Sequence, residues 1–176
     1  MNAWKHFKTI TCHKYFVMKG CFKVGLYKQG LLHDLSKYSP SEFWVGAKYF
    51  QGNQSPNNAE RDALGYSSAW LHHKGCNKHH YEYWIDYNTQ AGGMAPVPMP
   101  TRYVVEMLVD RIAASKIYEG KNYTDASPLK YYLKGVEKAP IHPDTAALLE
   151  KLLRMLAQKG EKKTFAYVRR KLLHRT

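Results

Sequence analysis

Apolar side chains recur every three or four positions along almost the whole chain, and the alternation typical of β-strands is scarce. Between residues 3 and 19 this spacing defines one helical face, which carries His6, Ile10, His13 and Val17. Residues 39–42, Ser-Pro-Ser-Glu, form a capping-box sequence with proline at the first helical position, and they predict a helix through about residue 49. The pattern as a whole predicts an all-α protein.

The same spacing predicts the other helices, and glycines mark their ends. Gly65 is expected to interrupt one helix, Gly120 to end another and Gly160 to cap a third. Residues 75–100 are the least regular part of the chain. The predicted helices cover residues 3–19, 31–35, 39–49, 59–74, 101–119, 128–138, 143–159 and 162–174.

Length and composition favour one folded domain. With 176 residues and 44% hydrophobic positions, the chain can bury on the order of 70% of its unfolded surface without disulfide bonds. Its cysteines are odd in number and irregularly spaced, so we expect reduced thiols in a cytoplasmic protein. Lysines interrupt the N-terminus, which is therefore not expected to be a signal peptide, and no segment approaches the ~20 apolar residues of a membrane span. We expect no membrane partner.

Positive charge is in excess along the chain. The 27 lysine and arginine residues outnumber 14 aspartate and glutamate residues and give a formal net charge of +13. This balance favours an anionic partner, such as a phosphorylated small molecule or a nucleic acid. Much of the excess follows residue 150, where residues 162–174 predict a basic amphipathic helix. We expect any nucleic-acid contact at this helix, and an ordinary lysine-rich surface is the alternative.

Histidines gather between residues 33 and 80. Four of them fall within nine residues around Gly75, as the pairs His72-His73 and His79-His80. Neutral imidazole is the commonest transition-metal ligand, and carboxylates complete a harder, hydrolytic site. We expect one member of each pair to face a metal, although the sequence does not choose within the pairs.

The pair His33-Asp34 lies inside an apolar run. On a helix, neighbouring side chains diverge by ~100°, so these two cannot stack on each other. They can converge on a single shared ion, or bind two ions with Asp34 between them. The alternative is a helix end at which Asp34 caps the helix or pairs with Lys37.

Two further residues join this pair as candidate ligands. Asp110 lies on an apolar stripe of the predicted helix 101–119, and a buried, unpaired carboxylate is costly. It therefore needs a cation, which is either a metal ion or an arginine such as Arg102. His13 lies on the inward face of the first helix, one helix before His33.

The order His13, His33-Asp34, paired histidines and Asp110 resembles the HD superfamily of metal-dependent phosphohydrolases, whose ligands follow the pattern H…HD…(H…H)…D on successive helices. Residues 33–37, His-Asp-Leu-Ser-Lys, are similar to its HD-(L/I)-G-K motif, with Ser36 in place of the glycine. More narrowly, HDLSKYSPSEFW and GYSSAWLHHKGCNKHHYEYW resemble a bacterial and phage family of uncharacterised proteins over about residues 5–125.

This resemblance implies a fold and a set of ligands. The fold is a single compact HD-type helical domain of about six to eight helices, with residues 1–140 as its metal-binding part and residues 141–176 as a C-terminal helical extension packed on it. The implied core ligands are His13, His33, Asp34 and Asp110, and ligands for a second ion come from His72, His73, His79 and His80. The cofactor is one or two divalent transition ions, iron, manganese or zinc.

The resemblance also implies a role for basic residues. Asp34 and Lys37 would be catalytic, and the substrate would contact Lys37, Lys74, Lys78 and Arg111. The function implied is a metal-dependent phosphohydrolase, a phosphomonoesterase or phosphodiesterase acting on a nucleotide or another small phosphate ester. Two alternatives remain open. One is an HD-type di-iron oxygenase, and the other is a nucleic-acid-binding protein with a structural metal site.

Overall fold

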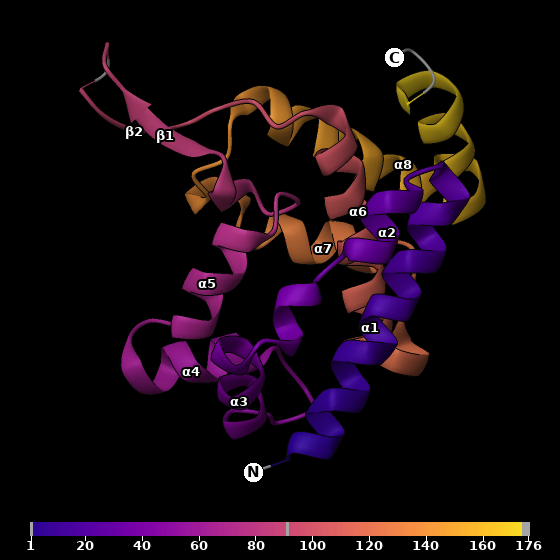
Figure 1. The fold of residues 1–176 in the computed structure, drawn as a ribbon. Coiled ribbons are helices and arrows are strands. Elements are labelled where there is room, and N and C mark those ends of the chain that lie inside the picture. Colours follow the sequence, from indigo (N-terminus) through magenta and orange to yellow (C-terminus); the bar gives the residue numbers. More distant parts are fainter. Residues whose placement is uncertain (1, 91, 174–176) are drawn as a thin grey trace.

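The computed structural model describes residues 2–90 and 92–173, and it confirms an all-α fold (Figure 1). None of the helices in these residues combines the length and apolar character that a membrane span requires. The α-helices of the described residues are α1 (Ala3–Val24), α2 (Tyr27–Leu32), α3 (Pro40–Lys48), α4 (Pro56–Leu64), α5 (Ser68–Cys76), α6 (Thr101–Glu119), α7 (Ser127–Leu133) and α8 (Pro143–Tyr167).

Short elements connect these helices. A two-stranded antiparallel sheet, β1 (Ile85–Asn88) with β2 (Gly93–Pro96), projects from one side of the molecule (Figure 1). The sequence pattern predicts only an irregular segment where this hairpin lies. The remaining turns are the 3-10 helices η1 (Leu35–Tyr38), η2 (Tyr81–Tyr83), η3 (Gly120–Asn122) and η4 (Val136–Lys138), and the π-helical segment η5 (Val168–Leu173).

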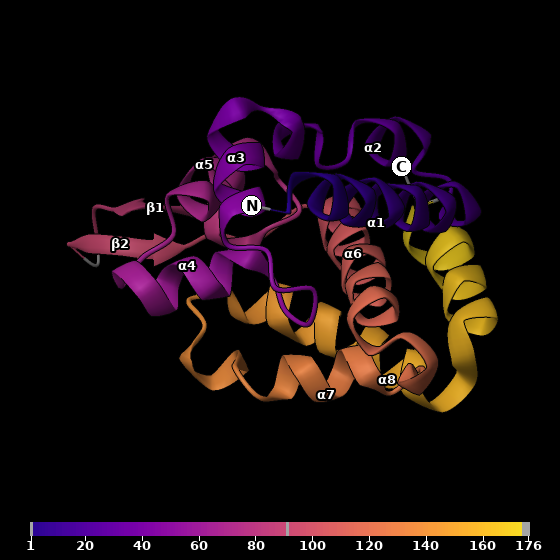
Figure 2. The ribbon, with the colours of Figure 1, turned by 90° about the horizontal axis from the view of Figure 1, so that it is seen from below.

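Helix α6 runs through the middle of the molecule, between α1 on one side and α7 and α8 on the other (Figure 2). Residues 104–109, 112 and 113 of this helix are buried, so buried side chains lie on nearly all of its sides. A single apolar stripe, as expected from the sequence, therefore does not describe the helix. The core cluster contains residues of four α-helices: Val17 and Cys21 of α1, Val105 and Leu108 of α6, Tyr132 of α7, and Leu149, Leu152 and Leu156 of α8. This core fixes α1 against α6, and both helices carry side chains of the site described below.

Proline and glycine positions located most helix ends correctly. Helix α3 begins at Pro40 and α6 ends at Glu119, before Gly120, as predicted. Gly65 adopts a left-handed conformation, with φ of 79°, and separates α4 from α5. The break in the predicted helix 59–74 is therefore confirmed, although α4 already begins at Pro56.

The prediction that residues 31–35 form a helix is wrong. Helix α2 ends at Leu32, His33 is extended, and Asp34 has a left-handed backbone with φ of 54° and ψ of 27°. The Lys14 ammonium of α1 donates hydrogen bonds to the carbonyls of Leu31 (2.6 Å) and His33 (2.8 Å). The carbonyl groups that would continue the helix are thus bound by a lysine, and the chain turns at Asp34.

The C-terminal helices also differ from the prediction. Gly160 leaves the helical conformation, with φ of 79° and ψ of 165°, but α8 continues beyond it to Tyr167. Gly160 therefore bends a long helix instead of capping it. The predicted helix 162–174 becomes the end of α8 followed by η5, and residue 174 lies outside the described residues. The predicted helix 128–138 is divided into α7 and η4.

The close approach of α1 and α6 depends on Gly20. A Cβ atom at this position would lie 2.5 Å from Cγ1 of Val109. We expect Gly20→Ala to lower the free energy of unfolding by about 1–3 kcal/mol, because overpacking a rigid contact outweighs the helix propensity of alanine. Urea unfolding followed by circular dichroism measures the change.

Gly75 of α5 provides the matched control, since no atom lies within 4 Å of a Cβ atom added there. Gly75→Ala should raise the free energy of unfolding by about 0.5–1 kcal/mol. The double variant Gly20→Ala/Val109→Ala should recover part of the lost stability. Equal, positive effects of both glycine substitutions would contradict the proposed contact.

Candidate metal centre

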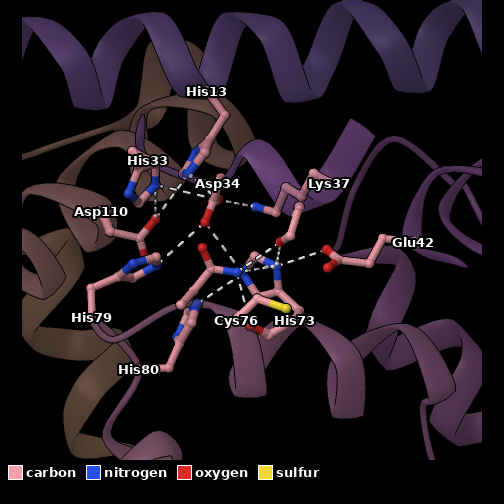
Figure 3. A network of polar contacts seen from close by, with 12 residues as sticks. His13, His33, Asp34, Lys37, Glu42, His73, Cys76, His79, His80 and Asp110 are labelled. Carbon is pink, nitrogen blue, oxygen red and sulfur yellow. Dashed lines mark hydrogen bonds and ion pairs between the residues drawn. The ribbon is translucent and has the colours of Figure 1, made fainter. Parts of the chain in front are cut away.

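The site is built around Asp34, whose carboxylate is buried in the turn between α2 and η1. Asp34 is the one non-glycine residue with positive φ among the described residues. Aspartate tolerates this region better than most residues, but the conformation still costs free energy and is held by the surrounding structure. Its side chain points into a ring of imidazoles that come from α1, α5 and the segment before η2 (Figure 3).

One oxygen of Asp34 faces the imidazoles of the N-terminal half. Oδ2 lies 3.6 Å from Nε2 of His13 and 3.3 Å from Nε2 of His33. Asp110 of α6 closes this group, with its Oδ1 2.8 Å from Nε2 of His13 and 3.6 Å from Nε2 of His33. Two imidazole nitrogens and two carboxylates thus face a common point, and together they could hold one metal ion.

The other oxygen of Asp34 faces a second set of imidazoles. Oδ1 lies 3.4 Å from Nε2 of His73 and 3.4 Å from Nε2 of His79. His80 joins them, since its Nε2 is 2.9 Å from Nε2 of His73. These four residues could hold a second ion, and Asp34 belongs to both groups.

Several of the ligand atoms are buried without a well-formed hydrogen bond. Among the described residues, Oδ1 of Asp34 and Nε2 of His33 and His79 have no hydrogen-bond partner. Oδ2 of Asp34 and Nε2 of His13 have close ionic neighbours, Lys37 and Asp110, but no well-formed hydrogen bond. Buried polar atoms are normally satisfied, and leaving several unpaired in one place is costly. A metal ion within each group would bind these unpaired atoms, so the donor set fits one or two transition ions.

The opposite nitrogens of these imidazoles are bound by a second carboxylate. Oε1 of Glu106 lies 2.9 Å from Nδ1 of His33 and 3.3 Å from Nδ1 of His79. Gln29 donates a hydrogen bond of 2.6 Å to Oε2 of the same glutamate. Contact with a carboxylate places the proton on Nδ1 and leaves Nε2 free to bind a metal. Glu106 therefore orients one ligand of each group.

Glu42 acts in the same way on the other side of the site. Its Oε2 lies 2.8 Å from Nδ1 of His73, and its Oε1 lies 2.6 Å from Nδ1 of His72. The sequence assigned Glu42 to a capping box, but Ser39 makes no side-chain cap. The helix begins where the box predicts, while the glutamate turns inward to the two histidines.

The structure distinguishes the members of the first histidine pair. His73 is buried, whereas the side chain of His72 is 41% exposed and belongs to neither ligand group. In the second pair, both His79 and His80 belong to the group around Oδ1 of Asp34. The first pair therefore contributes one candidate ligand and the second pair contributes two.

Charge compensation governs the titration of the site. Burial alone would raise the pKa of Asp34, but the charges of His33, Lys37 and His73 outweigh burial and hold this pKa well below its ordinary value. Burial would also lower the pKa of His33, yet Asp34, Asp110 and Glu106 hold it well above 6.5. Metal ions must therefore displace protons from this site, and their affinity should rise with pH.

A cavity of about 840 Å³ adjoins the two ligand groups, with His13, His73, His80 and Asp110 in its wall. Lys37 and Arg111 line it, together with Arg61 and Lys134, which were not predicted from the sequence. Lys37 holds its ammonium 2.6 Å from Oδ2 of Asp34. The other predicted substrate contacts, Lys74 and Lys78, are not part of the cavity wall.

Glu42 and Glu106, the carboxylates behind the histidines, were not predicted as site residues from the sequence. Glu106 precedes Asp110 by four residues, so the two share one face of α6. This spacing was the available sign in the sequence that Glu106 belongs to the site. A second carboxylate on the same buried face as Asp110 also needs a cation or hydrogen-bond donors beside it. Asp110 pairs with histidines, and the alternative partner Arg102 supplies only its backbone carbonyl, to Gln29.

We expect two equivalents of a divalent transition metal in the protein, measured by elemental analysis after purification without a histidine tag. Asp34→Asn retains a residue suited to the left-handed turn but should lose both ions, because each group contains Asp34. His13→Ala and His80→Ala should each lose about one equivalent, since each belongs to one group only.

His72→Ala serves as the control, because His72 is a neighbour of a ligand without being one. Its metal content should equal that of the unchanged protein. Circular dichroism shows whether each variant remains helical. Full metal content in the Asp34→Asn protein would contradict the assignment of both groups.

The comparisons with known proteins identify a family and nothing more specific. No curated protein and no solved structure matches the chain. A family model described as a family of unknown function, DUF5662, matches residues 2–155, which include every side chain of both ligand groups. Because this match covers most of the 176 residues, the chain belongs to the family DUF5662.

Proposed function

We propose that the protein is a metal-dependent phosphohydrolase that acts on a nucleotide or another small phosphate ester through a dinuclear His/Asp site. The observation that carries this proposal is the position of Asp34. Each of its two oxygens faces its own set of imidazoles, at 3.3–3.6 Å, so one carboxylate can bridge two ions. Two-metal centres of this kind commonly catalyse in-line displacement at phosphorus.

The order of the ligands along the chain supports the same proposal. His13, His33-Asp34, the later histidines and Asp110 follow the pattern H…HD…(H…H)…D, and they lie near one another in space. Their proximity in space supports the resemblance to the HD superfamily that the order of the ligands suggests. We infer membership of that superfamily from this agreement.

When bound, the ions would supply Lewis acidity and lower the pKa of a water molecule toward ~7. The residues of the chain have separate tasks. Glu42 and Glu106 contact Nδ1 of the imidazoles and leave Nε2 available as the atom that would hold an ion. The walls of the cavity orient the phosphate ester beside the ligand groups and limit its contact with bulk water.

Lys37 has a position suited to the transferred phosphoryl group. Burial lowers its pKa, but Asp34 and Asp110 outweigh this effect and raise the pKa above its ordinary value, so the ammonium stays charged. If the carboxylate of Asp34 held metal ions, the Lys37 ammonium beside it would need a further anion. A phosphoryl oxygen in the cavity meets that requirement, and its developing charge would be stabilised by the same group.

Arg111 offers a second cationic contact. Its guanidinium lies over the ring of Tyr132, at 5.5 Å, in the wall of the cavity. Its Nε is buried and has no hydrogen-bond partner among the described residues. An anionic oxygen of the substrate would satisfy this donor, as arginine commonly does for phosphate.

The test is hydrolysis of p-nitrophenyl phosphate and bis-p-nitrophenyl phosphate, followed by a panel of nucleotides, with iron, manganese or zinc added. We expect activity that chelation removes and metal restores. Lys37→Met should reduce kcat by about 10²–10³-fold while both ions remain, because it removes a charged donor that is not a ligand.

Asp34→Asn should lose metal and activity together, whereas His72→Ala should keep both. Hydrolysis by metal-free Asp34→Asn protein would contradict the mechanism. Oxygen consumption by the iron-loaded protein, without hydrolysis of any ester in the panel, would instead support the oxygenase alternative.

A further inference from the structure

The N-terminal third of the protein has an unusual distribution of charge. Residues 2–61 contain only three carboxylates, and each is buried, with exposed fractions of 2% for Asp34, 5% for Glu42 and 2% for Glu60. The first exposed carboxylate along the chain is therefore Asp62. The same segment exposes a set of lysines to solvent, namely Lys5, Lys8, Lys19, Lys23, Lys28 and Lys48.

The outward face of α1 combines these lysines with aromatic rings. Trp4, Lys8, Tyr15 and Lys19 recur at intervals of three or four residues through Cys12, so they share one stripe of the helix. The ammonium of Lys8 lies 4.9 Å from the ring centre of Trp4, and that of Lys19 lies 5.0 Å from the ring centre of Tyr15. Trp4 and Tyr15 remain 65% and 51% exposed.

The stripe continues into a basic hollow at the C-terminal end of α1. There Lys23 lies beside the last turns of α8 and the segment η5, in a hollow of about 670 Å³. Glu161 in this hollow is already paired with Lys23 (2.8 Å) and with Lys116. The cations that remain in its wall come from the C-terminal segment, Lys162, Arg169 and Arg170.

We propose that this surface, the outer stripe of α1 with the adjoining C-terminal hollow, binds single-stranded nucleic acid. The lysines and arginines would neutralise phosphates, and the exposed rings of Trp4 and Tyr15 would stack on unpaired bases. Base stacking on aromatic side chains and a cationic path for the backbone are the two features of sequence-tolerant single-strand binding. Both features lie on one helix here.

A lipid surface fits these observations less well. A helix that lies in a membrane interface needs a free apolar face opposite its polar face. The apolar face of α1 is already used, because Ile10, Val17, Cys21 and Val24 are buried in the core. On the outward face, aromatic and cationic residues alternate, and two lysines lie directly over two of the rings.

The length of the stripe sets the size of the ligand. From Trp4 to Lys23 the helix rises about 28 Å at ~1.5 Å per residue. At the ~3.4 Å that separates neighbouring nucleotides of one strand, this length covers about eight nucleotides. If about four phosphates are neutralised, the logarithm of the affinity should fall with the logarithm of salt concentration with a slope of about −3.

Fluorescence anisotropy with labelled single strands of about twelve nucleotides, DNA and RNA, tests the proposal on the protein as purified. Lys8→Glu/Lys19→Glu should weaken binding at least about tenfold. Lys121→Glu/Lys138→Glu makes the same change of net charge at exposed positions that belong neither to α1 nor to the wall of the hollow, and should have little effect. Trp4→Ala/Tyr15→Ala should weaken binding about tenfold without changing the salt slope.

Each result decides the proposal. Weaker binding in the α1 charge-reversal and aromatic variants, with little change in the control pair, supports binding on α1. If the Asp34→Asn variant also binds the strand, this support does not depend on what the metal centre catalyses. Equal losses in both charge-reversal pairs, or no loss in the aromatic variant, would overturn it. Binding only to vesicles of anionic phospholipid, tighter binding to duplex than to single strands, or binding lost in Asp34→Asn would also overturn it.

Discussion

The structure depends on keeping the charge of Asp34 inside the protein. A buried carboxylate without hydrogen bonds is among the most costly groups in a fold, and the left-handed backbone at Asp34 adds to that cost. Helices α1, α5 and α6, the 3-10 helix η1 and the segment before η2 supply the polar groups around it. Lys14 fixes the turn by binding the carbonyls of Leu31 and His33. The Lys37 ammonium, 2.6 Å from Oδ2, compensates part of this charge, and the imidazoles that face both oxygens could hold metal ions that compensate it further.

The two ligand groups are coupled through more than their shared aspartate. Glu106 contacts Nδ1 of His33, which belongs to one group, and Nδ1 of His79, which belongs to the other. A change in the position of Glu106 would therefore move one ligand of each ion. Because α6 carries both Glu106 and Asp110 and its central residues are buried in the core, the packing of the core also sets the geometry of the site.

The sequence predicted the fold class, most helix ends and the set of candidate ligands, because each has a local cause. Helical spacing, proline and glycine act within a few residues, and histidine pairs are conspicuous in any sequence. Which imidazole of His72-His73 faces inward depends on the register of α5 against α3, which is a tertiary contact. The turn at Asp34 and the inward direction of Glu42 depend likewise on Lys14 and His73, which are distant in sequence.

The positive charge of the surface and the chemistry of the interior have a common origin. In the N-terminal third, each carboxylate is buried and bound to other groups. Asp34 lies between the ligand groups, and Glu42 contacts Nδ1 of His73. Glu60 accepts hydrogen bonds from Ser67 and Ser68 at the start of α5. None of the three balances the exposed lysines of this segment, and Glu161 of α8 pairs with Lys23, so the outer face of α1 stays cationic. The net charge of +13 is therefore distributed unevenly over the surface. The position of positive charge on a helix that also exposes aromatic rings indicates a polyanionic partner more strongly than the size of the charge does.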